Sequence, residues 1–337
     1  VAIQKGLQNP VLTQNKMLMD APRTAPNHHL DYPVLNPLLQ VWVFAHAGGP
    51  LQWENRLPIQ GFALALLLLL AAGLRHVLRP ALVAALVAIF AVMNETLTST
   101  RTCYADVMVG VGMVIACDAW LRSQQDRTGP WWWLVLLGLS VAAWSKNEGM
   151  MYLCVAVVAG FLACWGRLPG APSHNPFAGR PGVLVIPFLF LGATLSINFI
   201  FGFTNELIGS EASGSSFLER LMDQQDRGAA IAGFTFDKLL MSRDRYFVFL
   251  GFFVLLASCP VRAFAGPRAP SLFLVLALLG ILAVYMATPA KIHWHLATSA
   301  PRVAWQLAPC MLLWMGYLLR EHIAVLRSLV PQGGRPQ

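Results

Sequence analysis

Charged residues are scarce in this sequence. They make up 12% of the 337 residues, whereas an ordinary soluble domain carries about a quarter. Hydrophobic residues make up 56%, and the mean hydropathy is +0.57. So few charges leave too little polar surface to cover a water-soluble protein of this size. An intrinsically disordered chain is also excluded, because such chains are poor in the aliphatic and aromatic residues that are abundant here.

Cysteine and acidic residues are also few. The six cysteines form no C-x-x-C pair and most lie in apolar runs, which excludes a small secreted module held by disulfides. The 16 acidic residues are outnumbered by 24 basic ones, giving a net charge of +8. We attribute this excess to the loops of a polytopic all-α membrane protein, and we predict no nucleic-acid partner.

Long hydrophobic runs divide most of the chain. A membrane-spanning helix needs about 20 mostly apolar residues. About nine stretches approach this length: 57–74, 80–94, 104–121, 130–145, 149–166, 182–203, 245–260, 271–288 and 303–319. The apolar segment 35–47 is too short to cross and predicts a helix lying in the interface, with Trp42 and Phe44 as anchors.

The basic residues orient this bundle. Alternate connections and the C-terminal tail carry ten cations: Arg75, Arg79, Arg122, Arg127, Arg167, Arg180, Arg262, Arg268, Arg320 and Arg327. Only Asp126 and Glu321 oppose them on that side, so the positive-inside rule makes it cytoplasmic. We therefore predict an extracytoplasmic first loop (1–56), a transmembrane bundle (57–319) and a cytoplasmic tail (320–337). This direction also requires a helix upstream of the chain, if the native N-terminus is cytoplasmic.

The outer side holds the connections 95–103 and 145–149, the turn 289–302 and a long loop, 204–244. Within that loop, Ser216 and Glu219 form a capping-box pattern that predicts an amphipathic helix on the membrane surface. The same pattern equally fits an ordinary surface helix packed on the spans.

Asp31 and Asp106 are the candidate catalytic carboxylates. Asp31 precedes Pro33 in a turn at the membrane surface, where it would serve as a general base or simply cap the next helix. Asp106 lies one turn inside a predicted span, where a charge is costly unless it is paired or functional. The alternative role for Asp106 is a structural ion pair with Arg101. A metal site at His28, His29 and Asp31 is a minor alternative.

Two further polar motifs carry cations. Lys146 and Glu148 form a compact knot that ends at Gly149, either a phosphate-binding pair or a plain polar turn. Arg302 opens the last span from the outside, where its guanidinium would clamp a phosphate or reach lipid headgroups. His293 and His295 would share a face only on a strand, so we interpret them as polar loop residues.

Four motifs in this order resemble the lipid-linked-sugar glycosyltransferases of the GT-C fold. They are HLDYPVLNPLL (29–39), YAD (104–106), KNEG (146–149) and SAPR (299–302), which continues to Pro309. The similarity is greatest to bacterial membrane proteins related to the dolichyl-phosphate-mannose protein mannosyltransferases and the aminoarabinose transferases. The motifs are short, but they are distributed over most of the chain, from residue 29 to Pro309.

The resemblance implies a multi-pass protein of the bacterial inner membrane that moves a sugar from a polyprenyl phosphate to an acceptor glycan, lipid or protein. Transfer would be inverting and occur on the outer side. Asp31 and Asp106 match the family's acidic residues, while Lys146, Glu148 and Arg302 match donor-site residues. Tyr32 and Arg101 are further candidate substrate-binding residues. No cofactor is predicted, and a divalent cation is left open.

The resemblance also implies a first helix and an early acidic residue, both absent from this chain, which begins inside the family's first outer loop. Two other functions stay open. A flippase for a lipid-linked glycan would need ionisable residues near the bilayer midplane, where the sequence offers only Asp118, close to the cytoplasmic end. The second open function is that of a non-catalytic subunit that keeps the transferase fold.

Overall fold

The computed structural model describes residues 35–49, 56–102, 104–124, 126, 131–165, 225–242, 247–265, 268–288 and 292–329. Every element within these ranges is helical. Asp31, Tyr32, the predicted span 182–203 and the capping-box segment 216–219 lie outside the described residues.

The helices of the first half are α3 (Leu35–Ala47), α4 (Leu57–Arg75), α5 (Pro80–Ala91), α6 (Asn94–Arg101), α7 (Asp106–Ser123), α8 (Trp131–Ser145) and α9 (Asn147–Trp165). Those of the second half are α12 (Gln225–Phe234), a π-helical turn (Thr235–Leu240), α13 (Val248–Ser258), α14 (Pro260–Ala265), α15 (Arg268–Ala287), α16 (Ile292–Thr298), α17 (Ala300–Trp305) and α18 (Ala308–Leu329). The prediction of a helix over 35–47 is confirmed.

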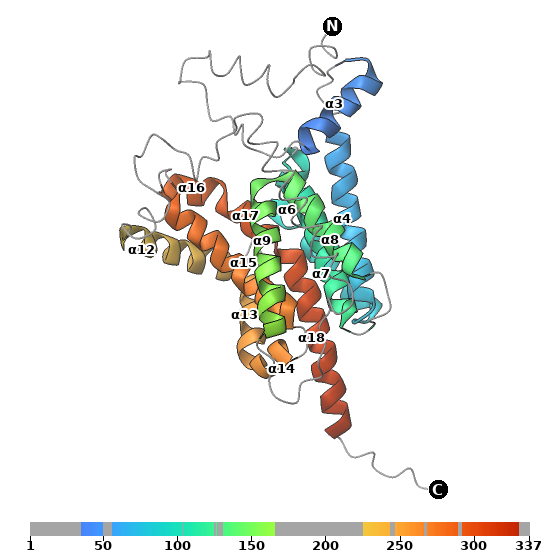
Figure 1. Cartoon of the computed structure of the whole chain (residues 1–337), viewed down its shortest axis with the longest axis vertical. Coiled ribbons are helices and arrows are strands. Elements are labelled where there is room, and N and C mark those ends of the chain that lie inside the picture. Colours follow the sequence, from blue (N-terminus) through green and yellow to red (C-terminus); the bar gives the residue numbers. More distant parts are fainter. Residues whose placement is uncertain are drawn as a thin grey trace.

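Most residues of helix α7 are buried, and α4 and α8 lie beside it (Figure 1). It packs against α4, α8 and α18, while α9 lies between α8 and α15. Two glycines allow the closest of these contacts, because a Cβ added to Gly112 would lie 2.4 Å from the carbonyl oxygen of Gly138. The reverse distance, from a Cβ on Gly138 to the Gly112 oxygen, is 2.3 Å. Paired small residues of this kind let helix backbones touch inside a membrane.

Two described helices, α4 and α15, are long and apolar enough to cross a membrane. The bent pair α5 and α6 makes a third if it is counted as one span. Three other predicted spans, α8, α9 and α13, are apolar but shorter over their described residues. Helix α7 has sufficient length, but its 18 residues include Asp106, Asp118 and Arg122. The described chain thus supports two or three spans by length and composition, where the hydropathy pattern predicted about nine.

Three predicted segments have the wrong boundaries. The region 95–103 was expected to be a short connection, but α6 occupies most of it and is bent by 59° from α5. The predicted span 303–319 is divided at Gln306 and Leu307 into α17 and α18. Pro309 explains that break, because proline has no N–H to donate to the carbonyl four residues earlier. The expected turn 289–302 likewise contains α16 and the start of α17.

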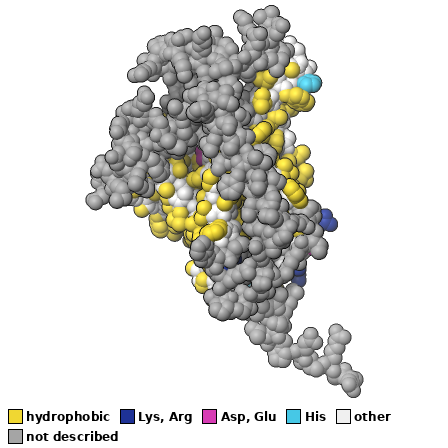
Figure 2. Space-filling model, in the orientation of Figure 1, with side chains coloured by type: hydrophobic (Ala, Val, Ile, Leu, Met, Phe, Trp, Pro, Cys, Tyr) yellow, Lys and Arg dark blue, Asp and Glu magenta, His cyan; other side chains and the backbone are white. Residues whose placement is uncertain are grey.

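The described surface is largely apolar. Figure 2 shows hydrophobic side chains over much of it, with Lys and Arg near the lower right of the view. On α4, the side chains of Leu64 and Leu68 are 59% and 60% exposed, as expected of a helix face that meets lipid. Trp42, predicted as an interfacial anchor, is also exposed on α3.

Candidate functional site

The carboxylate of Asp106 lies at the centre of a polar cluster. Asp106 is the first residue of α7 and is fully buried. Lys146 Nζ lies 3.0 Å from its Oδ1, and Gln306 Nε2 donates to the same oxygen at 2.6 Å. Arg302 Nη1 lies 3.5 Å from Oδ2. Two cations and an amide therefore hold this buried charge, and its partners come from regions some 40 and 200 residues away in the chain.

Arg101 is not part of the cluster. It is the last residue of α6, its side chain is exposed, and it makes no ion pair with Asp106 within the described residues. The interpretation of Asp106 as the partner of Arg101 is therefore wrong. Asp106 recruits more distant cations because tertiary packing brings α17 and the α8–α9 turn to the start of α7.

Lys146 occupies the single residue between α8 and α9. It is 3% exposed and makes a second ion pair, with Glu148 Oε1, at 3.0 Å. The turn is tight, because a Cβ added to Gly149 would lie 1.9 Å from the carbonyl oxygen of Ala142. Gly149 therefore lets α9 fold back closely on α8 and fixes Lys146 at the turn.

Arg302 lies at the edge of the cluster. Its side chain is 21% exposed, and its guanidinium carbon lies 4.0 Å from the centroid of the Tyr104 ring. Its Nε donates to the carbonyl of Thr298 at 3.3 Å. Arginine carries five N–H donors. The two on Nη2 of Arg302 have no partner among the described residues. This side chain is positioned to take an anion from outside.

A set of buried hydrogen bonds holds α17, which carries Arg302. The hydroxyl of Tyr152 on α9 donates to the carbonyl of Val303 at 3.1 Å. Trp305 Nε1 donates to Thr96 Oγ1 on α6 at 2.9 Å. A further bond of 2.9 Å joins the hydroxyls of Tyr285 on α15 and Ser299. Three neighbouring helices thus fix the position of α17 and of the guanidinium.

Burial divides the cluster into an interior and a rim. Asp106, Lys146 and Gln306 are almost completely enclosed, whereas the side chains of Glu148 and Arg302 are 20% and 21% exposed. The two carboxylates and two cations balance, so the cluster has no net charge. Its accessible part includes part of the Glu148 side chain and part of the Arg302 side chain, whose guanidinium lies against the exposed Tyr104 ring.

Four of the predicted site residues are thus brought together: Asp106, Lys146, Glu148 and Arg302. Asp31 and Tyr32 lie outside the described residues. Two further members of the cluster, Gln306 and Tyr104, lie within the quoted motifs but were not predicted as site residues. For Gln306 the available signal was an amide in an otherwise apolar run beside Pro309, because a polar side chain in such a run needs a buried partner.

The other polar features are separate from this cluster. His293 and His295 lie on α16, not on a loop as predicted, and positions i and i+2 of a helix do not share a face. The described residues contain no group of three or more His, Cys, Asp or Glu side chains placed to hold a metal ion.

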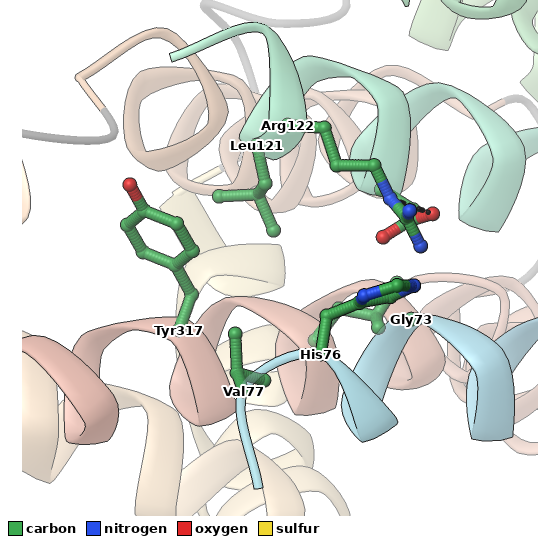
Figure 3. Close-up of a pocket in the computed structure, with 8 residues that line it drawn as sticks. Gly73, His76, Val77, Leu121, Arg122 and Tyr317 are labelled. Atoms are coloured by element: carbon green, nitrogen blue, oxygen red, sulfur yellow. Dashed lines mark hydrogen bonds and ion pairs between the residues drawn. The ribbon is translucent and has the colours of Figure 1, made fainter. Parts of the chain in front are cut away.

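A small pocket lies at the opposite end of α7. Asp118 and Arg122, which are ion-paired at 2.9 Å, line it together with His76 and Tyr317 (Figure 3). Asp118 is 12 residues from Asp106 along α7, a rise of about 18 Å. The pocket therefore belongs to the other end of the bundle and shares no lining residue with the Asp106 cluster.

Comparisons with protein-family models, with curated proteins and with solved structures found no match to this chain. The similarity to GT-C transferases is therefore carried by the four short motifs alone. Three of these motifs, YAD, KNEG and SAPR, meet in the Asp106 cluster, and the fourth, which contains Asp31, lies mostly outside the described residues.

Proposed function

We propose that this protein is a multi-pass membrane glycosyltransferase. It would move a sugar from a polyprenyl-phosphate donor to an acceptor hydroxyl, with inversion, on the extracytoplasmic face of a bacterial inner membrane. One observation carries the proposal: an ionised cluster built from three separate motifs lies at one end of a predominantly apolar helical bundle. Charges in an apolar bundle are costly, so a converging set of them is a functional-site hypothesis by default.

Arg302 is the proposed ligand of the donor phosphate. Its Nη2 donors have no partner among the described residues, and its contact with Asp106 is long at 3.5 Å. A phosphodiester oxygen would therefore gain donors that the protein itself does not use. The Tyr104 ring beneath the guanidinium keeps its plane fixed, which favours two-point binding.

Asp106 and Lys146 have a supporting role in this proposal. With two cations and an amide around it, Asp106 holds Lys146 and Arg302 at fixed positions near the phosphate. The positive charge of Lys146 then helps to stabilise the leaving phosphate electrostatically. We retain Asp31 and Asp106 as the two candidates for the base that accepts the proton of the acceptor hydroxyl.

The reaction needs no oxidant or acid. The acceptor oxygen gives its proton to the base and forms a bond to the anomeric carbon, while the bond from that carbon to the phosphate oxygen breaks. Polyprenyl phosphate leaves with the bonding electrons, and attack from the opposite face inverts the anomeric configuration. The exposed apolar surface of the bundle would accommodate the polyprenyl chain beside the helices.

The decisive experiment supplies the purified protein, in its full native length and in lipid nanodiscs, with polyprenyl phosphates that carry glucose, mannose, galactose or arabinose. Bacterial membrane extract provides the acceptors. The proposal predicts release of polyprenyl phosphate from at least one donor, together with sugar attached to an acceptor. Movement of an intact lipid-linked sugar across proteoliposomes, with no release, would instead identify a flippase. The absence of both activities with every donor would overturn the proposal.

A further inference from the structure

Two buried oxygen atoms in the Asp106 cluster accept no hydrogen bond within the described residues. They are Gln306 Oε1 and Glu148 Oε2. A buried acceptor without a donor costs about 1–3 kcal/mol. The Gln306 side chain is fully enclosed, and Glu148 Oε2 is covered although part of its side chain is exposed. Two such atoms beside one ion cluster call for a common explanation.

The orientation of Gln306 is fixed by its neighbour. Its Nε2 donates to the Asp106 carboxylate at 2.6 Å, and turning the amide over would place two acceptor oxygens against each other. Oε1 must therefore face away from Asp106. Its missing partner has to be a donor that the described part of the chain does not supply.

The Glu148 carboxylate likewise has one oxygen that receives no hydrogen bond from the described residues. Its Oε1 lies 3.0 Å from Lys146 Nζ, which also lies 3.0 Å from Asp106. The remaining oxygen, Oε2, is a charged acceptor with no donor among the described residues. Three successive contacts of 2.6, 3.0 and 3.0 Å link Gln306 to Glu148 through Asp106 and Lys146. The two acceptors thus lie at the two ends of one chain of contacts.

We infer that Gln306 Oε1 and Glu148 Oε2 form a subsite that accepts hydrogen bonds from hydroxyl groups of the donor's sugar. This inference rests on the proposed function and adds to it the part of the substrate that the carboxylate side of the cluster recognises. A phosphate has no donors for these oxygens and would be repelled by Glu148. Bound metal is disfavoured because the ammonium of Lys146 already lies against the same carboxylate.

The subsite predicts that the sugar and the phosphate are recognised by different residues of the cluster. Arg302 would take the phosphate, while Glu148 and Gln306 would take hydroxyls. A carboxylate makes charge-assisted hydrogen bonds with hydroxyls, which are about twice as strong as bonds between neutral groups. Glu148 should therefore contribute more to sugar binding than Gln306, and neither should contribute much to binding of a lipid phosphate that carries no sugar.

The test measures binding to the full-length protein in nanodiscs by native mass spectrometry. The probes are polyprenyl phosphate, the same lipid carrying the hexose or pentose that gives turnover, and its monodeoxy analogues. Glu148→Gln keeps the size of the side chain and removes its charge. It should weaken binding of the glycosylated lipid by roughly tenfold, and that of bare polyprenyl phosphate by less than about twofold. Asp118→Asn, at the other end of α7, is the control and should change neither.

The deoxy analogues separate recognition from a general effect on folding. For one deoxy analogue, the affinity for the wild type should be about as low as the affinity of the complete glycosylated lipid for Glu148→Gln. Glu148→Gln itself should bind this analogue no less tightly than it binds the complete glycosylated lipid. Equal losses for bare and glycosylated lipid, or no hydroxyl whose removal mimics the variant, would overturn the subsite while leaving the proposed function intact. Binding that vanishes on adding EDTA would show a metal in its place. Failure of the wild type to bind any probe would overturn both.

Discussion

Replacing Asp106 by Asn removes the charge on which the polar cluster is centred. Asn keeps the size and one acceptor oxygen, so Lys146 and Gln306 can still donate to it. Lys146 also keeps its ion pair with Glu148 at 3.0 Å, and Arg302 is partly exposed to solvent. No cation is therefore left buried and unpaired. A buried charge without a partner would lower the free energy of unfolding by about 3–5 kcal/mol. We expect a smaller loss of about 1.5–3 kcal/mol in the free energy of unfolding, the usual value for a charged hydrogen bond.

The loss of transfer should be much larger than this change in stability suggests. Without the negative charge, Arg302 and Lys146 both lose their ion pair with residue 106, and misplacing a substrate-binding group by about 1 Å can cost 100-fold in rate. We therefore predict that Asp106→Asn lowers transfer by at least about 100-fold. Release of polyprenyl phosphate measures the rate, and size-exclusion and thermal-unfolding profiles show whether the variant is folded.

The matched control is Asp118→Asn. It makes the same substitution on the same helix, at an ion pair with Arg122 whose side chains are about one quarter exposed. Exposed pairs of this kind contribute at most about 1 kcal/mol, and we expect transfer to stay within about twofold of the wild type. A folded Asp106→Asn variant with wild-type transfer, or an equal loss in both variants, would refute the role given to the cluster.

Two further substitutions test parts of the account. Arg302→Lys keeps the charge but loses the planar fork and its stacking on Tyr104, so transfer should fall roughly 10- to 100-fold with little change in Tm; unchanged transfer would show that a point charge suffices. Gly149→Ala places a Cβ 1.9 Å from the Ala142 oxygen and should destabilise the α8–α9 turn by about 1–3 kcal/mol. Gly233→Ala on α12, where nothing lies within 4 Å of the added Cβ, is its control in thermal unfolding and should not lower Tm.

Much of the helical architecture could be predicted from the sequence. Hydropathy placed helices over α3, α4, α7, α8, α9 and α15 with boundaries close to those observed, because long apolar runs without charges have few other stable structures. It failed where a helix bends or breaks. Helix α6 is polar (NETLTSTR), so its sequence resembles a loop, and the break before α18 lies within a mostly apolar run; composition alone reveals neither feature.

The cluster was predictable only in part. Asp106, Lys146, Glu148 and Arg302 could be identified because charges at the ends of apolar helices need partners. Which charges pair could not be deduced. Arg101 is near Asp106 in sequence yet makes no ion pair with it, while Gln306 is 200 residues away and donates to it at 2.6 Å. Such pairing depends on how α7 and α17 pack, which no local pattern encodes.

Whether the Asp106 cluster transfers a sugar is tested most directly by following the release of polyprenyl phosphate per protein molecule, and its rate, in a single turnover. The experiment compares the wild type with Arg302→Met, using the lipid-linked sugar that the donor panel identifies and acceptors from membrane extract. We predict about one molecule released per wild-type protein, and a rate at least about 100-fold lower when the guanidinium is absent. Equal rates of release by the two proteins, or a donor left intact by both, would contradict the assignment of the Asp106 cluster as a glycosyl-transfer site.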